Sequence, residues 1–202
     1  MLHEKTFYYV RHGETDYNKE DRMQGLLDIP LNETGIAQAH AAKHLFEGIE
    51  IGSVVCSPLI RARRTAEIIC AVVDRPISIL DELHECDLGV RDGDLKEQWY
   101  HDWKASRIEI EGAETYEQLV ARSLGAINRA IAENPGPVLI VAHGGIYWAI
   151  KRHAGLPEDF RLANCLPLRH EPPNGERDKW TVTDLGAGKD IGEGWSGSLP
   201  AR

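Results

Sequence analysis

A strand signal runs directly into charged residues at Thr6-Phe7-Tyr8-Tyr9-Val10-Arg11-His12-Gly13-Glu14-Thr15. Residues 6–10 favour β-structure and form the short apolar run of a buried strand. The run ends at Arg11 and His12, and Gly13 then lets the backbone turn sharply or approach a ligand closely. Ligands bind at the carboxyl edge of open α/β sheets. The pattern therefore suits an anion that Arg11 holds and the imidazole of His12 attacks.

Two further predicted strands end in the same way. Residues 52–56 lead into Ser57-Pro58, which predict the cap and first position of a helix. Residues 138–142 are continuously apolar, as in a central strand buried on both faces, and His143 and Gly144 follow directly. We expect these strand ends to meet at one edge of the sheet and to form a single positive pocket.

Arg61 lies in the first turns of the helix predicted after Ser57, together with Arg63 and Arg64. Such a run is usually a solvated cationic face. Cations near a helix N-terminus, however, oppose the helix dipole by about 0.3–1 kcal/mol each. An arginine there is better placed when it faces a bound anion. We therefore assign Arg61 to the pocket, and Arg63 and Arg64 to solvent.

The remaining pattern is that of an α/β chain. Asn32 can cap a helix, and Thr115-x-x-Gln118 reads as a capping box. Residues 92–107 are weakly helical, with three aromatic residues, at 99, 100 and 103, as packing or pocket-lining groups. The predicted strands cover residues 6–10, 52–56, 76–80, 138–142, 166–170 and 179–185, and the helices cover 33–46, 59–73, 115–134 and 146–153.

Length and charge limit the classes of protein. The 202 residues suit one domain, placed at residues 1–185, with a glycine-rich tail at 186–202. A formal charge of −9 argues against nucleic acid or anionic membranes as partners. We find no membrane span or signal peptide, and the four scattered cysteines indicate free thiols in a reducing, cytoplasmic compartment. The oligomeric state stays open.

Two other motifs are assigned no function. His40 and His44 are four residues apart on a predicted helix, but no third ligand joins them, so we expect surface histidines and no metal site. Gly192-x-Gly194-x-x-Gly197 matches a dinucleotide fingerprint in spelling only, because no helix can follow it. The role of Trp195 is not revealed.

The motifs together resemble the histidine phosphatase superfamily, the phosphoglycerate mutase-like fold, over about residues 6–185. Arg11-His12-Gly13-Glu14-Thr15 is similar to the signature of that family. Three later blocks also resemble it in the same order, and the ordered set is specific although each block alone is weak. They are Ser57-Pro58-Leu59-x-Arg61-Ala62-x-x-Thr65-Ala66, Glu82-Leu83-x-Glu85-x-x-x-Gly89 and Ala142-His143-Gly144-Gly145.

The resemblance implies a three-layer α/β/α sandwich with a mostly parallel central sheet. It also implies phosphoryl transfer through a phosphohistidine, without metal or cofactor, in which His12 is the nucleophile. Glu85 corresponds to the general acid, a choice that the spacing of four carboxylates between residues 81 and 87 does not make by itself. The other site residues implied are Arg11, Arg61 and His143 around the phosphate, and Asn18, Gln24, Gly25 and Gly144 for binding the substrate.

Three functions stay open. The preferred one is a phosphatase for a small phosphorylated metabolite, because the chain lacks the long insertion and basic C-terminal tail of bisphosphoglycerate-dependent mutases. A mutase shares every core residue, whereas a non-catalytic binding relative would need neither His12 nor Glu85. Residues 112–115 read Gly-Ala-Glu-Thr where the family often has Gly-Gly-Glu-Ser, so the substrate is not identified. A protein phosphohistidine or phosphotyrosine also stays among the candidates.

Overall fold

The computed structural model describes residues 1–157 and 159–191. The helices are α1 (Asp16–Lys19), α2 (Glu33–His44), α3 (Ile60–Val73), α4 (Gln98–Lys104), α5 (Tyr116–Glu133) and α6 (Gly144–Ala154). The strands are β1 (Phe7–Arg11), β2 (Ser53–Cys56), β3 (Ile77–Ile79), β4 (Val138–Ala142), β5 (Pro167–Glu171), β6 (Thr181–Asp184) and β7 (Lys189–Asp190). Two 3-10 turns, η1 (Asp81–Leu83) and η2 (Gly89–Arg91), follow β3.

The strands form one sheet in the order β3-β2-β4-β1-β5-β6-β7. The first four strands in this order are parallel, and β5, β6 and β7 join as antiparallel strands. β4 lies between β1 and β2 with every residue buried, as its continuous apolar sequence predicted. The expected parallel centre and the late antiparallel strands are both confirmed.

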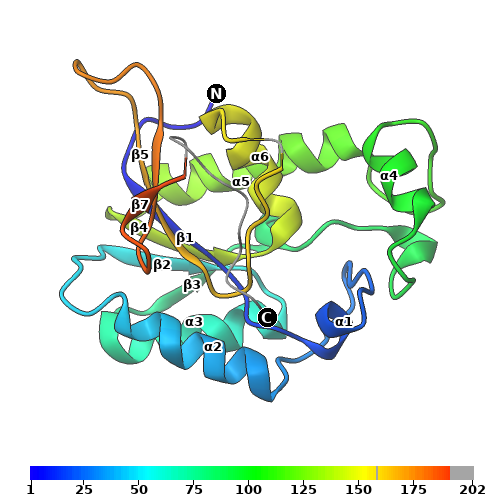
Figure 1. Ribbon diagram of the computed structural model, residues 1–202, viewed down its shortest axis with the longest axis horizontal. Helices are drawn as coiled ribbons and strands as arrows, with labels where there is room; N and C mark the ends of the chain where they lie inside the picture. Colours follow the sequence, from blue (N-terminus) through cyan, green and yellow to red (C-terminus); the bar gives the residue numbers. More distant parts are fainter. Residues whose placement is uncertain (158, 192–202) are drawn as a thin grey trace.

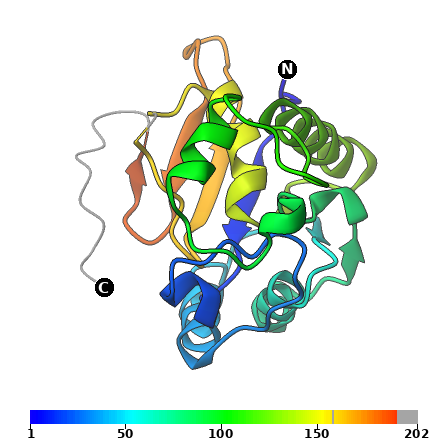
Figure 2. The ribbon, with the colours of Figure 1, turned by 90° about the vertical axis from the view of Figure 1, so that its right-hand side faces the viewer.

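Helices cover both faces of the sheet, which confirms the three-layer sandwich (Figure 1). Successive side chains of a strand point to opposite faces. Phe7 and Tyr9 of β1 therefore pack in the core that α5 and α6 cover, and Tyr8 and Val10 pack in the core that α3 covers. The short helices α1 and α4 lie beyond the carboxyl ends of the parallel strands, as Figures 1 and 2 show from two sides.

The capping signals at Asn32 and Thr115 predicted two helix starts correctly, whereas the buried face of α2 was predicted less well. Asn32 Oδ1 accepts a hydrogen bond of 2.8 Å from Gly35 N at the start of α2, and Thr115 opens α5 with a capping box. The spacing of Ile36, Ala39, Ala42 and Leu45 predicts a core stripe on α2, and this prediction is wrong at Ile36, which is 37% exposed. The buried residues of α2 are instead Gly35, Ala39 and Ala42, because this helix packs closely through small residues. Of residues 92–107, only α4 is helical.

The sheet continues past residue 185, where the sequence analysis ended the domain. β7 pairs with β6, and Ile191 is buried in the core. A strand of two residues in a glycine-rich segment has no alternating pattern, so the sequence did not predict it. The Gly192-x-Gly194-x-x-Gly197 match and Trp195 lie outside the described residues.

The described part of the chain contains no helix with the length and hydropathy that crossing a membrane requires. All four cysteines are free thiols, as the sequence predicted. Three of them, Cys56, Cys86 and Cys165, are buried. These thiols therefore contribute packing rather than a covalent constraint.

Two glycines let the loop after β1 contact α2 directly through backbone atoms. A Cβ on Gly13 would lie 2.4 Å from the carbonyl oxygen of Gly35. A Cβ on Gly35 would lie 2.1 Å from the carbonyl oxygen of Glu14. Neither position accepts a side chain without a backbone shift, so this contact fixes the path of the chain just after His12.

Replacing Gly35 by alanine should destabilise the protein by about 1–3 kcal/mol, because the new Cβ overlaps the backbone of the loop. Gly125 is the matched control, since it is also helical but has open space around its missing Cβ. Gly125→Ala should stabilise the protein by about 0.5–1 kcal/mol through the higher helix propensity of alanine. Chemical denaturation measures both variants, and a Gly35→Ala variant as stable as wild type would contradict this packing.

Candidate active site

The carboxyl ends of β1, β2 and β4 bring the predicted pocket residues to one place. β1 and β4 are paired in register up to Arg11 and Ala142, and β2 and β4 up to Cys56 and Val141. The next residue of each chain segment stays attached to the sheet, because His12 N donates to the carbonyl of Ala142 at 3.0 Å and Ser57 N to that of Val141 at 3.1 Å. His12, Ser57 and His143 therefore emerge side by side.

The hydrogen bonds of His12 determine its tautomer. His12 is 1% exposed, and its Nδ1 lies 2.7 Å from the carbonyl oxygen of Gly13. A carbonyl oxygen only accepts, so Nδ1 carries the proton and Nε2 holds the lone pair of the neutral ring. The ring of His143 lies beside it, with 5.2 Å between the two ring centroids.

Both imidazoles are disfavoured in their protonated form. Burial lowers the pKa of His12 well below its ordinary value, and the positive charges of Arg61 and Arg11 lower it further. Burial likewise lowers the pKa of His143, and among the neighbouring charges that of Arg61 lowers this pKa most. The two rings are therefore neutral at neutral pH, which leaves the lone pair of His12 Nε2 available.

Ser57 serves the site rather than the helix that follows it. Its hydroxyl forms a hydrogen bond of 2.7 Å with Nε2 of His143. The prediction that Ser57 caps the next helix is wrong, because α3 begins at Ile60 with Leu59 as its N-cap residue. Tyr9 fixes the backbone of His143 from the other side, donating to its carbonyl at 2.7 Å and accepting from its N–H at 3.1 Å.

Arg61 and Arg11 point into this edge of the sheet without a carboxylate partner within ion-pair distance among the described residues. Arg61 is fully buried and donates to the carbonyls of Leu27 at 2.7 Å and Gly25 at 3.0 Å. Arg11 donates to the carbonyl of Leu162 at 3.0 Å. Burial lowers the pKa of Arg61 to about 10 and also lowers the pKa of Arg11. In both side chains Nε is buried without a hydrogen-bond partner.

This pair of cations suits an anion. A buried charge without a partner is costly, and a bound dianion would offset that cost with charge-assisted hydrogen bonds. Arg63 and Arg64 are exposed, and Arg64 pairs with Glu67, so the predicted division among the three arginines of α3 agrees with their placement.

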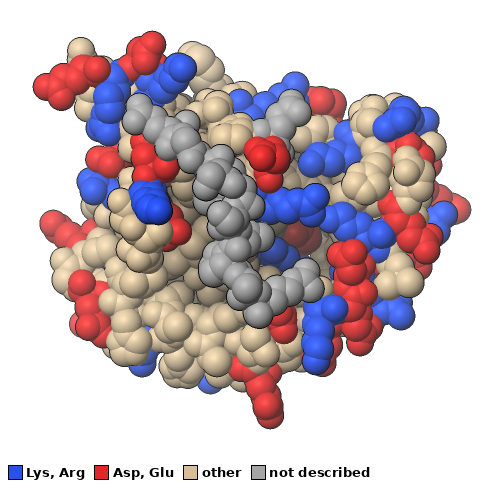
Figure 3. All heavy atoms as spheres, viewed as in Figure 1, with Lys and Arg blue, Asp and Glu red and all other residues tan. Residues whose placement is uncertain are grey.

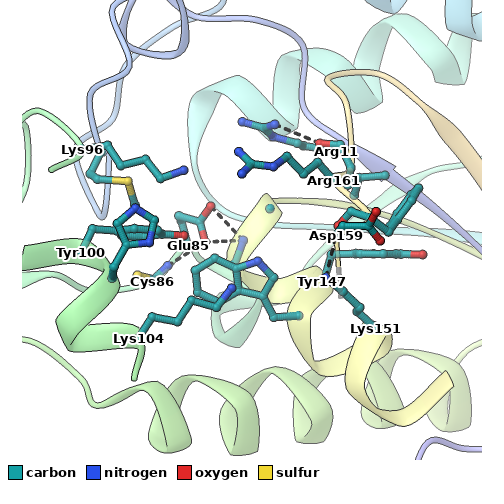
Figure 4. A pocket seen from close by; sticks show the side chains of 17 residues that line it. Arg11, Glu85, Cys86, Lys96, Tyr100, Lys104, Tyr147, Lys151, Asp159 and Arg161 are labelled. Carbon is teal, nitrogen blue, oxygen red and sulfur yellow. Dashed lines mark hydrogen bonds between the residues drawn. The ribbon is translucent and has the colours of Figure 1, made fainter. Parts of the chain in front are cut away.

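Glu85 faces the same edge from the segment after η1. Its Oε1 accepts hydrogen bonds from the backbone N–H groups of Cys86 at 2.9 Å and Gly145 at 3.1 Å, drawn as dashed lines in Figure 4. A Cβ on Gly145 would lie 2.3 Å from that oxygen, so only glycine at 145 admits this carboxylate. Glu85 also interacts electrostatically with Arg11 and Arg61.

Arg122 of α5 holds the backbone that carries Glu85, and the sequence analysis missed it. Its guanidinium donates to the carbonyls of Glu82 at 2.7 Å, His84 at 3.0 Å and Glu85 at 3.3 Å. It is also paired with Glu114, which in turn accepts from the backbone N–H of Asp87 at 3.0 Å. We call residues 82–85, which carry Glu85, the acid segment. No sequence spacing indicates its contact with α5, because the two segments come together only in the folded structure.

The four predicted substrate-binding residues lie around these groups. Asn18 Oδ1 accepts from Asn164 at 3.3 Å, and Asn164 also donates to the carbonyl of His12 at 2.8 Å. Gln24 is buried, and its Oε1 has no partner. Gly25 contributes its carbonyl to Arg61, and Gly144 begins α6 beside Arg11.

No group of three histidine, cysteine or acidic side chains that could hold a metal occurs in residues 1–157 and 159–191. His40 and His44 are exposed on α2, and His44 contacts Glu47. Their placement agrees with the prediction of surface histidines.

The neutral state of the two site histidines can be measured by NMR titration of their ring nitrogens. His12 and His143 should stay neutral well below pH 6.5, whereas in denaturant both should titrate near about 6.5. The unfolded chain then binds more protons than the native one below pH 6.5. The free energy of unfolding should therefore fall with decreasing pH by about 1.4 kcal/mol per unit for each histidine that stays neutral. A native midpoint at or above 6.5 for His12 would contradict the described electrostatics.

Comparison with known proteins agrees with the residues and the fold. The model of the histidine phosphatase superfamily (branch 1) matches residues 7–170. The chain is 36% identical over 180 residues to the uncharacterized phosphatase PhoE of Bacillus subtilis, covering 87% of this chain and 91% of the relative. It is 32% identical over 173 residues to the probable phosphoglycerate mutase GpmB of Cronobacter sakazakii, covering 78% and 80%.

Solved structures of phosphatases also match the fold of this chain. The native structure of mycobacterial glucosyl-3-phosphoglycerate phosphatase matches with a TM-score of 0.73 and 27% identity, covering 89% of this chain and 97% of that one. An alpha-ribazole-5'-P phosphatase assigned as putative in Escherichia coli matches with a TM-score of 0.70 and 25% identity, covering 93% and 96%. The expected family is confirmed: the chain belongs to the histidine phosphatase superfamily, branch 1.

Proposed function

We propose that this protein hydrolyses phosphomonoesters of small metabolites through a phosphohistidine formed on His12. One observation carries the proposal. A neutral imidazole, whose Nδ1–H donates to the Gly13 carbonyl, lies beside a second neutral imidazole. Both are within the field of two arginines that form no ion pair with a carboxylate of the described residues. That arrangement gives a nucleophile and the charge stabilisation that phosphoryl transfer requires.

In the first half of the proposed reaction, Arg11 and Arg61 bind the phosphate oxygens and His143 donates to one of them. The lone pair of His12 Nε2 attacks phosphorus, and the ester P–O bond breaks. Protonated Glu85 gives its proton to the departing alkoxide, so the alcohol leaves neutral. The phosphoryl group is now bonded to Nε2 of His12, whose Nδ1 keeps its proton and still donates to the Gly13 carbonyl.

Water completes the cycle in the second half. The Glu85 carboxylate takes a proton from the incoming water as its oxygen attacks phosphorus. The N–P bond breaks, its electron pair returns to Nε2, and inorganic phosphate leaves. Glu85 ends protonated and His12 neutral, so both groups are ready for another ester. The backbone contacts from Arg122 support this double role by keeping the acid segment in place.

The names of the relatives support a phosphatase reaction, but they do not agree on one substrate. One relative is named as an adenosylcobalamin/alpha-ribazole phosphatase of Escherichia coli, and another as a mycobacterial glucosyl-3-phosphoglycerate phosphatase. These two names give different substrates. We propose a small phosphorylated metabolite for this chain as well, and a cytoplasmic location consistent with its four free thiols.

A mutase is the second candidate, because several relatives at 32% identity are named probable phosphoglycerate mutases. Both reactions share the phosphohistidine, and they differ in whether water or an alcohol accepts the phosphoryl group. Release of inorganic phosphate identifies the phosphatase. Interconversion of phosphoglycerates that depends on added bisphosphoglycerate identifies the mutase.

His12→Ala should lower kcat by about a thousandfold or more, because the attacking lone pair is lost. Rapid quenching with radiolabelled substrate should trap a phosphoprotein in the wild type that is stable to alkali and labile to acid. His40→Ala is the matched control, since His40 is exposed on α2, and it should keep both turnover and label. Appreciable turnover or label in His12→Ala would remove His12 as the nucleophile.

Glu85→Gln should slow alkyl phosphates by about a hundredfold or more, because their alkoxides leave poorly without a proton. Aryl phosphates should slow far less, since their leaving groups need little protonation. Glu82→Gln serves as the control, because that side chain pairs with Arg129 and is half exposed. Equal slowing of alkyl and aryl esters would assign the acid to another group.

A further inference from the structure

A cavity of about 440 Å³ opens beside the candidate active site. Arg11, Glu85 and Gly144 form its inner end, whereas His12, Arg61 and His143 do not line it. A phosphate held at Arg11 with its ester oxygen toward Glu85 would therefore direct the rest of the ester into this space. The cavity is the place where the leaving group of the proposed substrate is recognised.

Among the charged side chains that line this cavity, basic ones outnumber acidic ones, although the whole chain carries a formal charge of −9. Figure 3 shows Lys and Arg gathered on the face between α6 and α4. Asp159 and Glu85 are the acidic residues of the lining, and the basic ones are Arg11, Lys96, Lys104, Lys151 and Arg161. Such a local excess of positive charge favours an anionic ligand.

Lys96 and Arg161 project into the cavity from opposite walls (Figure 4). Neither has a carboxylate within ion-pair distance among the described residues, whereas the exposed arginines at 64, 91, 129 and 152 are all paired. Lys96 is only partly exposed, and its Nζ lies 4.6 Å from the centre of the Tyr100 ring. The negative charge of Asp21 and the positive charges of Arg161 and Arg11 all act on it. Positive charges that face one cavity repel each other, and an anion bound between them offsets that repulsion.

The remaining wall is aromatic. Tyr100 of α4 and Tyr147 and Trp148 of α6 line the cavity, and the Nζ of Lys104 lies 4.3 Å from the centre of the Trp148 ring. These faces suit the carbon skeleton of a compact organic molecule. Lys104 stacks on this aromatic wall, whereas Lys96 and Arg161 extend into the cavity, where they can meet a second anionic substituent.

We propose that this cavity selects phosphomonoesters whose leaving group carries a second anionic group, a carboxylate or a phosphate, bound by Lys96 and Arg161. The proposal rests on the proposed function, because it places the scissile phosphate at Arg11. It assigns specificity to residues that the catalytic motifs do not include. Asp159 is exposed and lowers the positive potential without cancelling it.

Two matched pairs of esters test the proposal by initial rates of phosphate release. Glycerol 3-phosphate and 3-phosphoglycerate differ by a carboxylate, and the mono- and bisphosphate of propane-1,3-diol differ by a phosphate. The wild type should favour the doubly anionic member by about tenfold or more in kcat/KM in at least one pair. The pair that shows the preference identifies the anion.

Variants then assign the preference to residues. Lys96→Met and Arg161→Met should each lower the ratio of kcat/KM values about threefold or more, and the double variant should bring it near one. Lys96→Arg should keep most of the preference because it keeps the charge. Lys179→Met, which removes an exposed charge that does not line the cavity, is the matched control and should leave the ratio unchanged. Because both esters of a pair are measured with the same enzyme preparation, the ratio of their kcat/KM values does not depend on the fraction of enzyme that is folded.

The outcomes separate this proposal from the proposed function. Hydrolysis of 4-nitrophenyl phosphate together with equal kcat/KM values within both pairs would overturn the selectivity and leave the phosphatase intact. A full preference in the double variant would overturn the assignment to Lys96 and Arg161. Absence of phosphate release from every ester would overturn both proposals.

Discussion

Arg11 and Arg61 point into the carboxyl edge of the sheet and form no ion pair with any carboxylate in the part of the chain that the structure describes. The candidate site is arranged around that excess of positive charge. Removing a charged group from water costs several kcal/mol unless other groups replace the water. Backbone carbonyls of Leu27, Gly25 and Leu162 replace part of it. Burial is the main reason why His12 and His143 are neutral, and the remaining positive potential lowers the pKa of both rings further. The two neighbouring positive charges of Arg11 and Arg61 thus cost free energy by themselves but favour the binding of a dianion.

That excess of positive charge is maintained by contacts outside the strands. The carbonyls that receive Arg61 belong to the segment after α1, and Asp92 holds that segment by accepting from Leu26 N at 2.9 Å. A Cβ on Gly25, whose φ is +49°, would overlap Asp92, so the segment needs glycine there. On the opposite side, Arg122 binds three carbonyls of the segment that carries Glu85. The two segments are rigid because each is attached to the body of the domain by hydrogen bonds to its backbone.

Local chemistry was predictable where it depends on neighbours in the chain. The strand ends at Arg11-His12 and Ala142-His143 were visible because apolar runs stop abruptly at polar residues. The caps at Asn32 and Thr115 were visible because a cap acts within one turn. Ser57 was misassigned for the complementary reason. Its hydroxyl has a local use and a distant one, and the hydrogen bond to His143, 86 residues away, takes precedence.

The sequence by itself determined the order of the longer strands and helices, the residues at the strand ends and the net charge. These follow from hydrophobic periodicity and from turn chemistry, which operate over a few residues. The tertiary structure decided which carbonyls receive the guanidiniums, that Arg122 holds the acid segment, and that Lys96 and Arg161 share one cavity. Those contacts join segments that no local pattern relates, and they exist only because the packing of helices on the sheet sets the distances between them.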